Sequence, residues 1–312
     1  MKMFRKFACC FVVLTLLLSA GCVRQPREEE DATYHIVASF YPVYIFTLNL
    51  IENVQGVSLS NMTDGTGGCL HDYQLTTKDM RLLAGADMLV INGAGMEKFI
   101  DKAVGGAKDL TVVDSSAGVT ILEEAEDAHE DEEEAQAGEH SHEAAAHIWL
   151  SVPNAVRQVD NIYQALREAL PAQAETLSAN RDAYAARLNA LDAELKADAA
   201  ALTEPIVTFH SAYAYFSQEY GLPVLASIET EEGAEPSAKE LAGLKEIMRR
   251  EQVGSLFVEP EYAGTSAGVL ATETGAKIYT LNPITSGENI KTAYEDLMRN
   301  NMRTLLDAEG RS

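Results

Sequence analysis

Residues 206–222 read IVTFHSAYAYFSQEYGL, which predicts a buried strand over 206–209 followed by a helix over 213–220. Strands that alternate with helices are typical of parallel sheets, because a parallel connection needs a crossover. The same alternation continues on both sides of this stretch. The sequence therefore predicts an α/β fold with two similar lobes, each built on a parallel-rich sheet.

Short strands and amphipathic helices are predicted in both halves. The helix over 77–84 opens on Thr76, and Asp79 three residues later completes a capping box. The first half holds predicted strands over 35–39, 57–62, 88–92 and 111–113. The second half holds strands over 206–209, 224–227, 255–258 and 277–281, with helices over 213–220, 238–251 and 267–273.

An alanine-rich stretch over 154–202 separates the halves. It is almost free of predicted strands, Pro171 interrupts it, and Leu177, Tyr184 and Leu188 recur at helical spacing. An ordinary surface helix would suit this composition, but a long helix that joins two lobes also explains the position. Such a helix would limit lobe motion more than flexible strands would.

The amino-terminal segment has the features of an export signal. Three basic residues precede an apolar run over 7–18, which ends in the string SAGC at 19–22. The run has about a dozen residues, whereas a transmembrane helix needs roughly twenty. A small-small-Cys ending is similar to a bacterial lipobox, although Ser19 stands where leucine is usual. We expect cleavage after Gly21 and a lipid on Cys22 that holds the protein outside the bacterial cell membrane.

These features divide the chain into five parts. We expect a signal peptide at 1–21, a lipidated stalk at 22–33, a first lobe at 34–175 with an acidic loop at 123–143, an interlobe helix at 176–202, and a second lobe at 203–312. The formal charge of −24 excludes nucleic acid as a partner, because an acidic surface repels it. Only Cys69 would remain as a free thiol, so no intramolecular disulfide is expected.

The acidic loop differs in composition from the rest of the chain. Residues 123–143 hold eleven carboxylates and no lysine or arginine, together with His129, His140 and His142. A segment of this composition cannot pack a core, so we expect it to be disordered.

Four histidines lie outside this loop, and three of them share a context. His71 follows a glycine-rich turn after a strand, His210 ends the strand over 206–209, and His147 precedes a short apolar run and a helix. Ligands bind at the carboxyl ends of strands in open α/β sheets. His35 begins a strand instead, and we interpret it as a structural or surface residue.

Three imidazoles at strand ends could form a zinc site. Imidazole nitrogen is a good zinc ligand, and three of them leave a fourth tetrahedral position for water or another group. Asp72 and Ser211 lie beside two of these histidines and could orient the rings. Taken from the residues alone, a metal site and three separate non-ligand histidines remain as alternatives.

Five ordered strings carry a resemblance to a known family. The chain resembles the ZnuA/TroA-like zinc and manganese solute-binding proteins of ABC importers. The strings are GCLHDYQLTTKDM at 68–80, HIWLSVPNA at 147–155, VTFHSAYAYFSQEYGL at 207–222, EPSAKELAGL at 235–244 and LFVEPEYAG at 256–264. The resemblance implies two lobes joined by a long helix, with a metal in the cleft between them bound by His71, His147 and His210. Manganese-type members typically carry a carboxylate at the position of His210, so histidine there indicates zinc.

The fourth ligand departs from the family pattern. Many relatives have an acidic residue after the last strand, whereas this chain has Asn282 in YTLNPIT. We expect water in this position, with Glu261, a loop histidine, Cys69 or Asn282 itself as alternatives. Cys69 also fits a small buried packing residue. The acidic loop resembles an insertion of zinc-type members, where His129, His140 and His142 would capture zinc weakly or the loop would act as a spacer.

The resemblance implies a function outside the cytoplasm. The chain would be a monomeric zinc receptor, tethered by lipid on Cys22, that delivers zinc to an ABC permease with a cytoplasmic ATPase. It has no GxxxxGK[ST] loop of its own, and a clamp that closes on the ion does not suit an enzyme. The alternatives are a manganese or iron receptor of the same importer class and a metal-binding surface adhesion lipoprotein.

Overall fold

The computed structural model describes residues 32–64, 70, 73–104, 109–122, 145–208, 211–227, 236–260 and 265–311. Residues from Thr33 onward form one compact unit. The predicted signal peptide and Cys22 lie outside the described residues. No helix within the described ranges is long and apolar enough to cross a membrane.

Two parallel sheets form the frame of this unit. The first has the order β2-β1-β3-β4, with β1 at Tyr34–Ala38, β2 at Val57–Asn61, β3 at Met88–Ile91 and β4 at Thr111–Asp114. The second has the order β6-β5-β7-β8, with β5 at Ile206–Thr208, β6 at Val224–Ser227, β7 at Ser255–Val258 and β8 at Lys277–Thr280. Both sheets have the same topology, and the predicted α/β fold with two parallel sheets is confirmed.

Helices connect the strands in both halves. The first half contains α2 at Tyr41–Leu50, α3 at Thr77–Ala84 and α4 at Asp101–Val104. The second contains α7 at Ala214–Tyr220, α8 at Ala238–Arg250, α9 at Thr265–Thr274 and α10 at Ala293–Ala308. The predicted capping box is present, because the Thr76 side chain accepts from the Asp79 amide and the Asp79 carboxylate accepts from the Thr76 amide. Ser237 and Glu240 form a second box at α8.

The alanine-rich stretch forms two helices that pack together. Helix α5 covers Val152–Ala169, and the long helix α6 covers Ala174–Ala199, with a short 3-10 turn, η2 at Pro171–Gln173, between them. Pro171 can open this turn because it has no amide hydrogen to donate. The long helix is therefore confirmed, although it begins two residues earlier and ends three residues earlier than the predicted range 176–202.

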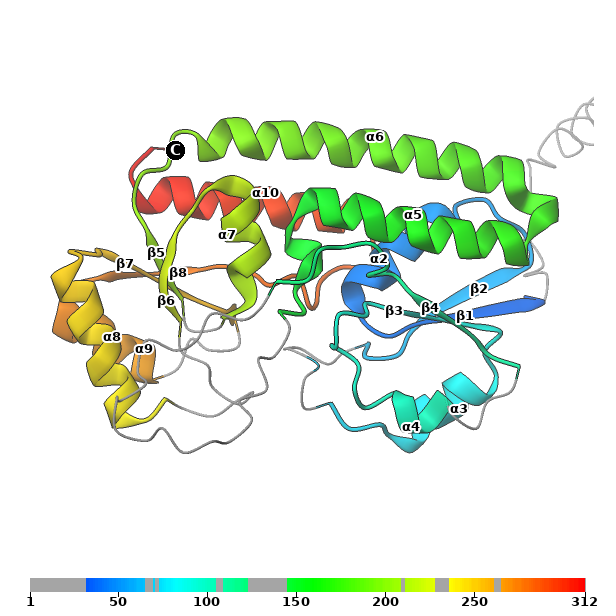
Figure 1. Cartoon of the computed structure of the whole chain (residues 1–312), viewed down its shortest axis with the longest axis horizontal. Coiled ribbons are helices and arrows are strands. Elements are labelled where there is room, and N and C mark those ends of the chain that lie inside the picture. The colour runs from blue at the N-terminus through cyan, green and yellow to red at the C-terminus, as the bar shows by residue number, and fades with distance from the viewer. Residues whose placement is uncertain are drawn as a thin grey trace, which may run out of the picture. The chain divides into compact units, whose positions relative to one another are not determined.

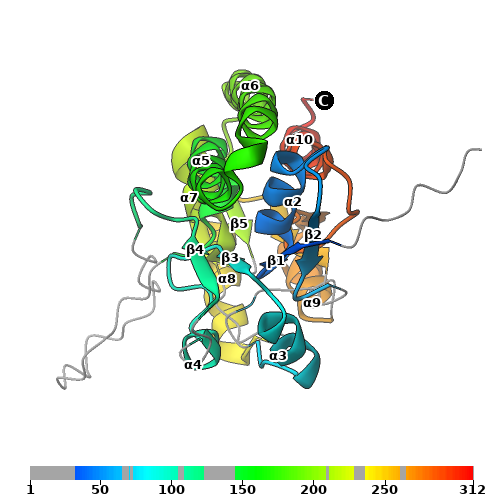
Figure 2. The same cartoon turned by 90° about the vertical axis from the view of Figure 1, so that its right-hand side faces the viewer.

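One hydrophobic cluster runs through both halves. It includes Ile36 and Val90 of the first sheet, Ile206 and Phe257 of the second, and Leu188 of α6. Figures 1 and 2 show α2, α5, α6 and α10 on one side of the sheets, with α3 and α4 on the opposite side of the first sheet. Burying one large apolar side chain contributes about 1.5–3 kcal/mol, so this shared cluster joins the two sheets energetically.

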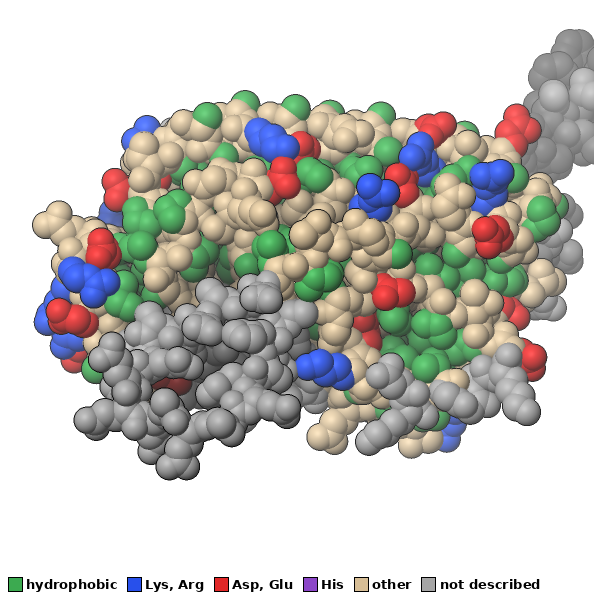
Figure 3. All heavy atoms as spheres, in the orientation of Figure 1, with side chains coloured by type: hydrophobic (Ala, Val, Ile, Leu, Met, Phe, Trp, Pro, Cys, Tyr) green, Lys and Arg blue, Asp and Glu red, His purple; other side chains and the backbone are tan. Residues whose placement is uncertain are grey.

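Charged side chains are distributed over the helical face. Acidic and basic groups are interspersed in Figure 3. Arg181 of α6 bonds to Asp160 of α5 at 2.7 Å, and Lys196 bonds to Glu219 of α7 at 2.7 Å. Exposed pairs of this kind each contribute less than about 1 kcal/mol, so the helices are held mainly by their apolar faces.

Candidate metal centre

Of the three predicted ligands, His147 lies within the described residues. It immediately precedes a short 3-10 helix, η1 at Ile148–Leu150, and only 1% of its surface is exposed. Its imidazole packs against the Trp149 ring, with 5.1 Å between the ring centroids and a tilt of 48°. Its orientation is therefore controlled by protein contacts and not by solvent.

Hydrogen bonds from both halves hold the segment 145–150. Asn92, which follows β3, donates from Nδ2 to the Ala146 carbonyl at 2.9 Å. Tyr215 of α7 donates to the Ala145 carbonyl at 2.9 Å. The segment that carries His147 therefore lies where the first and second halves meet, as a ligand of a shared site requires.

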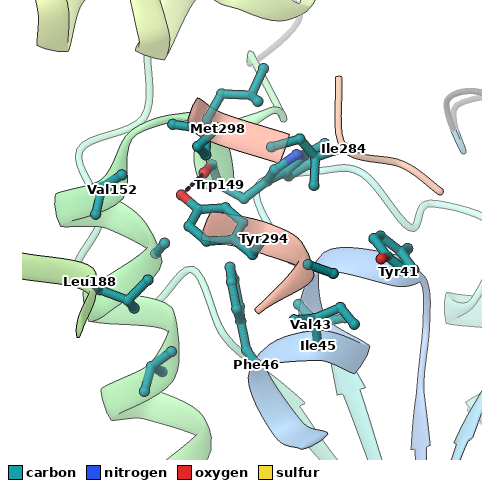
Figure 4. Packing of buried hydrophobic residues seen from close by; sticks show 14 of the residues in the cluster. Tyr41, Val43, Ile45, Phe46, Trp149, Val152, Leu188, Ile284, Tyr294 and Met298 are labelled. Carbon is teal, nitrogen blue, oxygen red and sulfur yellow. Dashed lines mark hydrogen bonds between the residues drawn. The ribbon is translucent and has the colours of Figure 1, made fainter. Parts of the chain in front are cut away.

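Two further bonds attach this segment to the second half. Tyr294 of α10 donates its hydroxyl to the Trp149 carbonyl at 2.7 Å, drawn as a dashed line in Figure 4. The indole N–H of Trp149 donates to the Pro283 carbonyl at 2.8 Å. All four tethers end on backbone carbonyls, so they position the chain around His147 without using its imidazole.

A buried polar network supports the segment from the first sheet. Glu97 accepts from Ser39 Oγ and from the Asn92 amide at 2.7 Å each, and from the Gly93 amide at 3.1 Å. Burial raises the pKa of Glu97 to about 7, although these hydrogen bonds lower it. Gln158 of α5 donates to Asn92 Oδ1 at 2.9 Å. The network holds the Asn92 side chain that in turn bonds to Ala146.

Glu97 and Asn92 were not identified from the sequence as functional residues. The available signal was polar residues placed directly after a buried strand, because β3 ends at Ile91 and Asn92 follows it. Such residues stand at the sheet edge where ligand sites are built.

The other two predicted ligands, His71 and His210, lie outside the described residues, but residues next to them are described. Thr208 ends β5 and is buried, and a 3-10 helix, η3 at Ser211–Tyr213, begins just after His210. Leu70, directly before His71, is also buried. The central strand β5 therefore ends two residues before His210 in the sequence, and the assignment of both histidines as ligands stays a prediction.

Asn282 has a structural role in the described fold. Its Oδ1 accepts from the Ile284 amide at 2.7 Å, and its backbone exchanges two bonds with the Asn301 side chain, at 2.8 and 2.7 Å. The amide oxygen that would bind a metal thus already accepts a hydrogen bond.

The remaining candidate ligands stay predictions. Cys69, Asp72 and Glu261 lie outside the described residues, as do the loop histidines His129, His140 and His142. Within the described ranges, no three histidine, cysteine, aspartate or glutamate side chains form a metal-binding group. Glu259, a buried carboxyl directly after β7, was not singled out from the sequence.

His35 and Ser266 represent two other kinds of site that the sequence could suggest. His35 is exposed on β1, and its Nδ1 lies 2.8 Å from Ser58 Oγ, consistent with the surface interpretation.

The string GTSAG at 264–268 matches the nucleophile pattern G-x-S-x-G. That pattern requires serine on the sharp turn after a strand, whereas Ser266 lies inside α9, well beyond the end of β7.

The fold and the junction at His147 define an α/β solute-binding protein. The Zn(II)-bound ZnuA-like domain of AdcA from Streptococcus pneumoniae has a similar structure, with a TM-score of 0.72 and 26% identity over 88% of this chain and 98% of that one. The model of the ZnuA family, described as zinc-uptake complex component A, periplasmic, matches residues 36–308, and the chain belongs to this family. The resemblance found in the motifs is thereby confirmed.

Curated relatives agree with this assignment. The high-affinity zinc uptake system protein ZnuA of Bacillus subtilis is 30% identical, over 98% of this chain and 98% of the relative. The zinc-binding lipoprotein AdcA of Streptococcus pneumoniae is 29% identical over 98% of this chain, which spans 62% of that longer protein. The family consists of solute-binding receptors and is not a class of enzymes.

Proposed function

We propose that this chain is an extracytoplasmic receptor that binds zinc and delivers it to an ABC-type importer. The observation that carries the proposal is the family match over 36–308, which includes all three histidines. Relatives named for zinc uptake and zinc binding support the choice of metal. The buried position of His147 at the junction of the halves fits a ligand shared between them.

The proposed ligands are His71, His147 and His210, with water in the fourth position. Three neutral imidazoles favour zinc over manganese, which prefers carboxylate and water oxygens. Water is preferred because Asn282 Oδ1 already accepts the Ile284 amide. Glu261, a histidine of the acidic loop and Cys69 are the alternatives, and replacing each with alanine distinguishes them from water, since only a true ligand would weaken zinc binding on removal.

The acidic loop is proposed to capture zinc weakly through His129, His140 and His142. The residues that flank the loop, Leu122 and Ala145, bond to each other and to Tyr215. The Ala145 amide donates to the Leu122 carbonyl at 2.9 Å, and the Tyr215 hydroxyl also accepts from the Leu122 amide at 3.0 Å. Residues 123–143 can therefore be replaced by a short glycine linker without moving His147. Unchanged zinc stoichiometry and uptake after this replacement would reject the capture role and leave a spacer.

The cellular arrangement is also a proposal. Lipid on Cys22 would hold a monomeric receptor at the outer side of the cell membrane, close to a permease whose cytoplasmic ATPase supplies the energy. Radiolabelled palmitate should label the wild-type chain and not Cys22→Ala. Equal labelling of both chains would reject the anchor.

The decisive experiment is zinc titration of the full-length chain. One tightly bound zinc should be lost when His71, His147 and His210 are all replaced by alanine, while weaker loop-bound ions remain. His35→Ala is the matched control, because His35 is exposed and its imidazole bonds to Ser58 of β2. Tight binding that survives in the triple variant would refute this ligand set.

The same titration separates the alternative functions. A manganese or iron receptor would bind Mn²⁺ or Fe²⁺ in preference to zinc in a competition assay. An adhesion lipoprotein would keep its surface ligand after chelation. An importer receptor should instead lose stability when the metal is removed, because a ligand that binds only the folded state stabilises it.

A further inference from the structure

Trp149 occupies the contact between His147 and the second half. It is the one tryptophan of the chain and is fully buried. On one side, Trp149 packs against the imidazole of His147, with 5.1 Å between the ring centroids. On the other side its indole N–H donates to the Pro283 carbonyl at 2.8 Å, across 134 residues of sequence.

The turn that accepts this bond is strained. Ile284 has a φ of +63°, in the left-handed region that β-branched residues rarely adopt, and it is fully buried. Strain of this kind costs about 1–3 kcal/mol and persists where the surroundings impose it. Here the surroundings are the Asn282 side chain, which holds the Ile284 amide, and the indole, which holds Pro283. Figure 4 draws Trp149 and Ile284 together with Tyr294.

We propose that Trp149 is a positioning residue that couples the orientation of the His147 imidazole to the strained turn 282–284 of the second half. The proposal rests on the proposed function, because it assumes that His147 binds the metal. A rotation of the indole would change both its packing against the imidazole and its bond to Pro283. The His147 imidazole is therefore held in one orientation before the metal binds.

This coupling differs from a merely structural role in its effect on the metal. Groups that hydrogen-bond to a metal-binding histidine typically contribute 10- to 100-fold to metal affinity by fixing the orientation of its ring, and the packing of Trp149 restricts the same rotation. A tryptophan that only filled the core would change the stability of the fold and leave the metal affinity unchanged. Zinc affinity and coordination geometry are therefore the informative measurements.

The test compares Trp149→Phe with Tyr41→Phe in the full-length chain. Phenylalanine at 149 keeps an aromatic ring but removes the bond to Pro283. The control removes the Tyr41 hydroxyl that donates at 2.6 Å to the Glu288 carbonyl, a bond to the same loop that involves neither Trp149 nor His147. We expect Trp149→Phe to raise the zinc Kd about 10-fold or more and to alter the visible absorption of bound Co²⁺. Tyr41→Phe should leave the zinc Kd and the Co²⁺ spectrum unchanged, since the bond that it removes involves neither Trp149 nor the His147 imidazole.

A second measurement uses the wild-type sequence in case the variant does not fold. 5-Fluorotryptophan labels one position only, and its ¹⁹F resonance should shift in step with zinc loading until one equivalent has bound. The proposal would be overturned by a ¹⁹F resonance that does not shift when zinc binds, or by equal zinc Kd values and Co²⁺ spectra in the two variants. Failure of the proposed function has a different result, because the wild-type chain would then bind no tight zinc at all.

Discussion

Replacing Glu97 with glutamine should change how the stability of the fold depends on pH. Burial raises the pKa of Glu97 from its ordinary value of 4.5 to about 7. The folded state therefore resists ionisation of this carboxyl, and stability that is present below pH 4.5 is lost as the pH rises through about 7. At about 1.4 kcal/mol for each pH unit, the loss amounts to about 3 kcal/mol.

The assay is urea unfolding of wild type and Glu97→Gln between pH 4 and 8, with a chelator present so that metal binding does not contribute. Glutamine cannot ionise, so the stability of wild type minus that of the variant should fall by about 3 kcal/mol over this range. The variant also carries a loss that is independent of pH, because Glu97 Oε2 accepts from the Gly93 amide and the glutamine NH₂ cannot. This loss shifts the difference equally at every pH. A difference that stays constant with pH would show that Glu97 ionises normally, and would refute the argument from burial.

Four other changes give direct tests of the fold and the site. Gly287→Ala places a methyl group 2.5 Å from Tyr41 Oη and should lower the free energy of unfolding by about 1–3 kcal/mol. The loss should be smaller when Gly287→Ala is made in a chain that already carries Tyr41→Ala, because the clashing ring is then absent. If the two substitutions instead have additive effects on the free energy of unfolding, the clash is contradicted. Tyr215→Phe removes the hydroxyl that bonds to the Leu122 amide and the Ala145 carbonyl, on either side of the acidic loop. The free energy of unfolding, measured by thermal unfolding, should fall by about 1–3 kcal/mol. Leu188→Ala empties a fully buried position on α6 and should cost about 2–5 kcal/mol in urea unfolding; a loss below 1 kcal/mol would mean that the site is not packed. Zinc affinity measured by competition should fall as the pH drops below about 6–7, because imidazoles bind metal only when neutral; a flat profile would argue against histidine ligands.

The sequence predicted the strands and the capped helices well because their signals are local. The capping box at Thr76 and the apolar strand over 255–258 depend on neighbouring residues, and both are present in the structure. Helix α2 was not identified, because its sequence YPVYIFTLNL is apolar on nearly every face and lacks helical periodicity. It is buried on most sides between β1, α5 and α6, a fact that only the tertiary fold shows.

The sequence predicted which histidines could form the candidate site, but not the hydrogen bonds that position them. Placing His210 after a strand needed only the string IVTFH. The bonds that hold the His147 segment join residues far apart in sequence, such as Asn92 with Ala146 and Trp149 with Pro283. Chain connectivity and residue type contain no direct signal for such contacts. A hydrogen bond across 134 residues depends on the packing of two sheets, which local patterns do not specify.

The hydrophobic cluster shared by the two sheets determines how the protein loses its structure. Because Ile36 and Phe257 belong to the same cluster, neither sheet can lose its packing while the other keeps a complete core. Unfolding should therefore be cooperative across both halves, with one calorimetric transition for residues 33–311 in place of two. A ligand bound at their junction would then protect the most distant strand as well as the residues it touches.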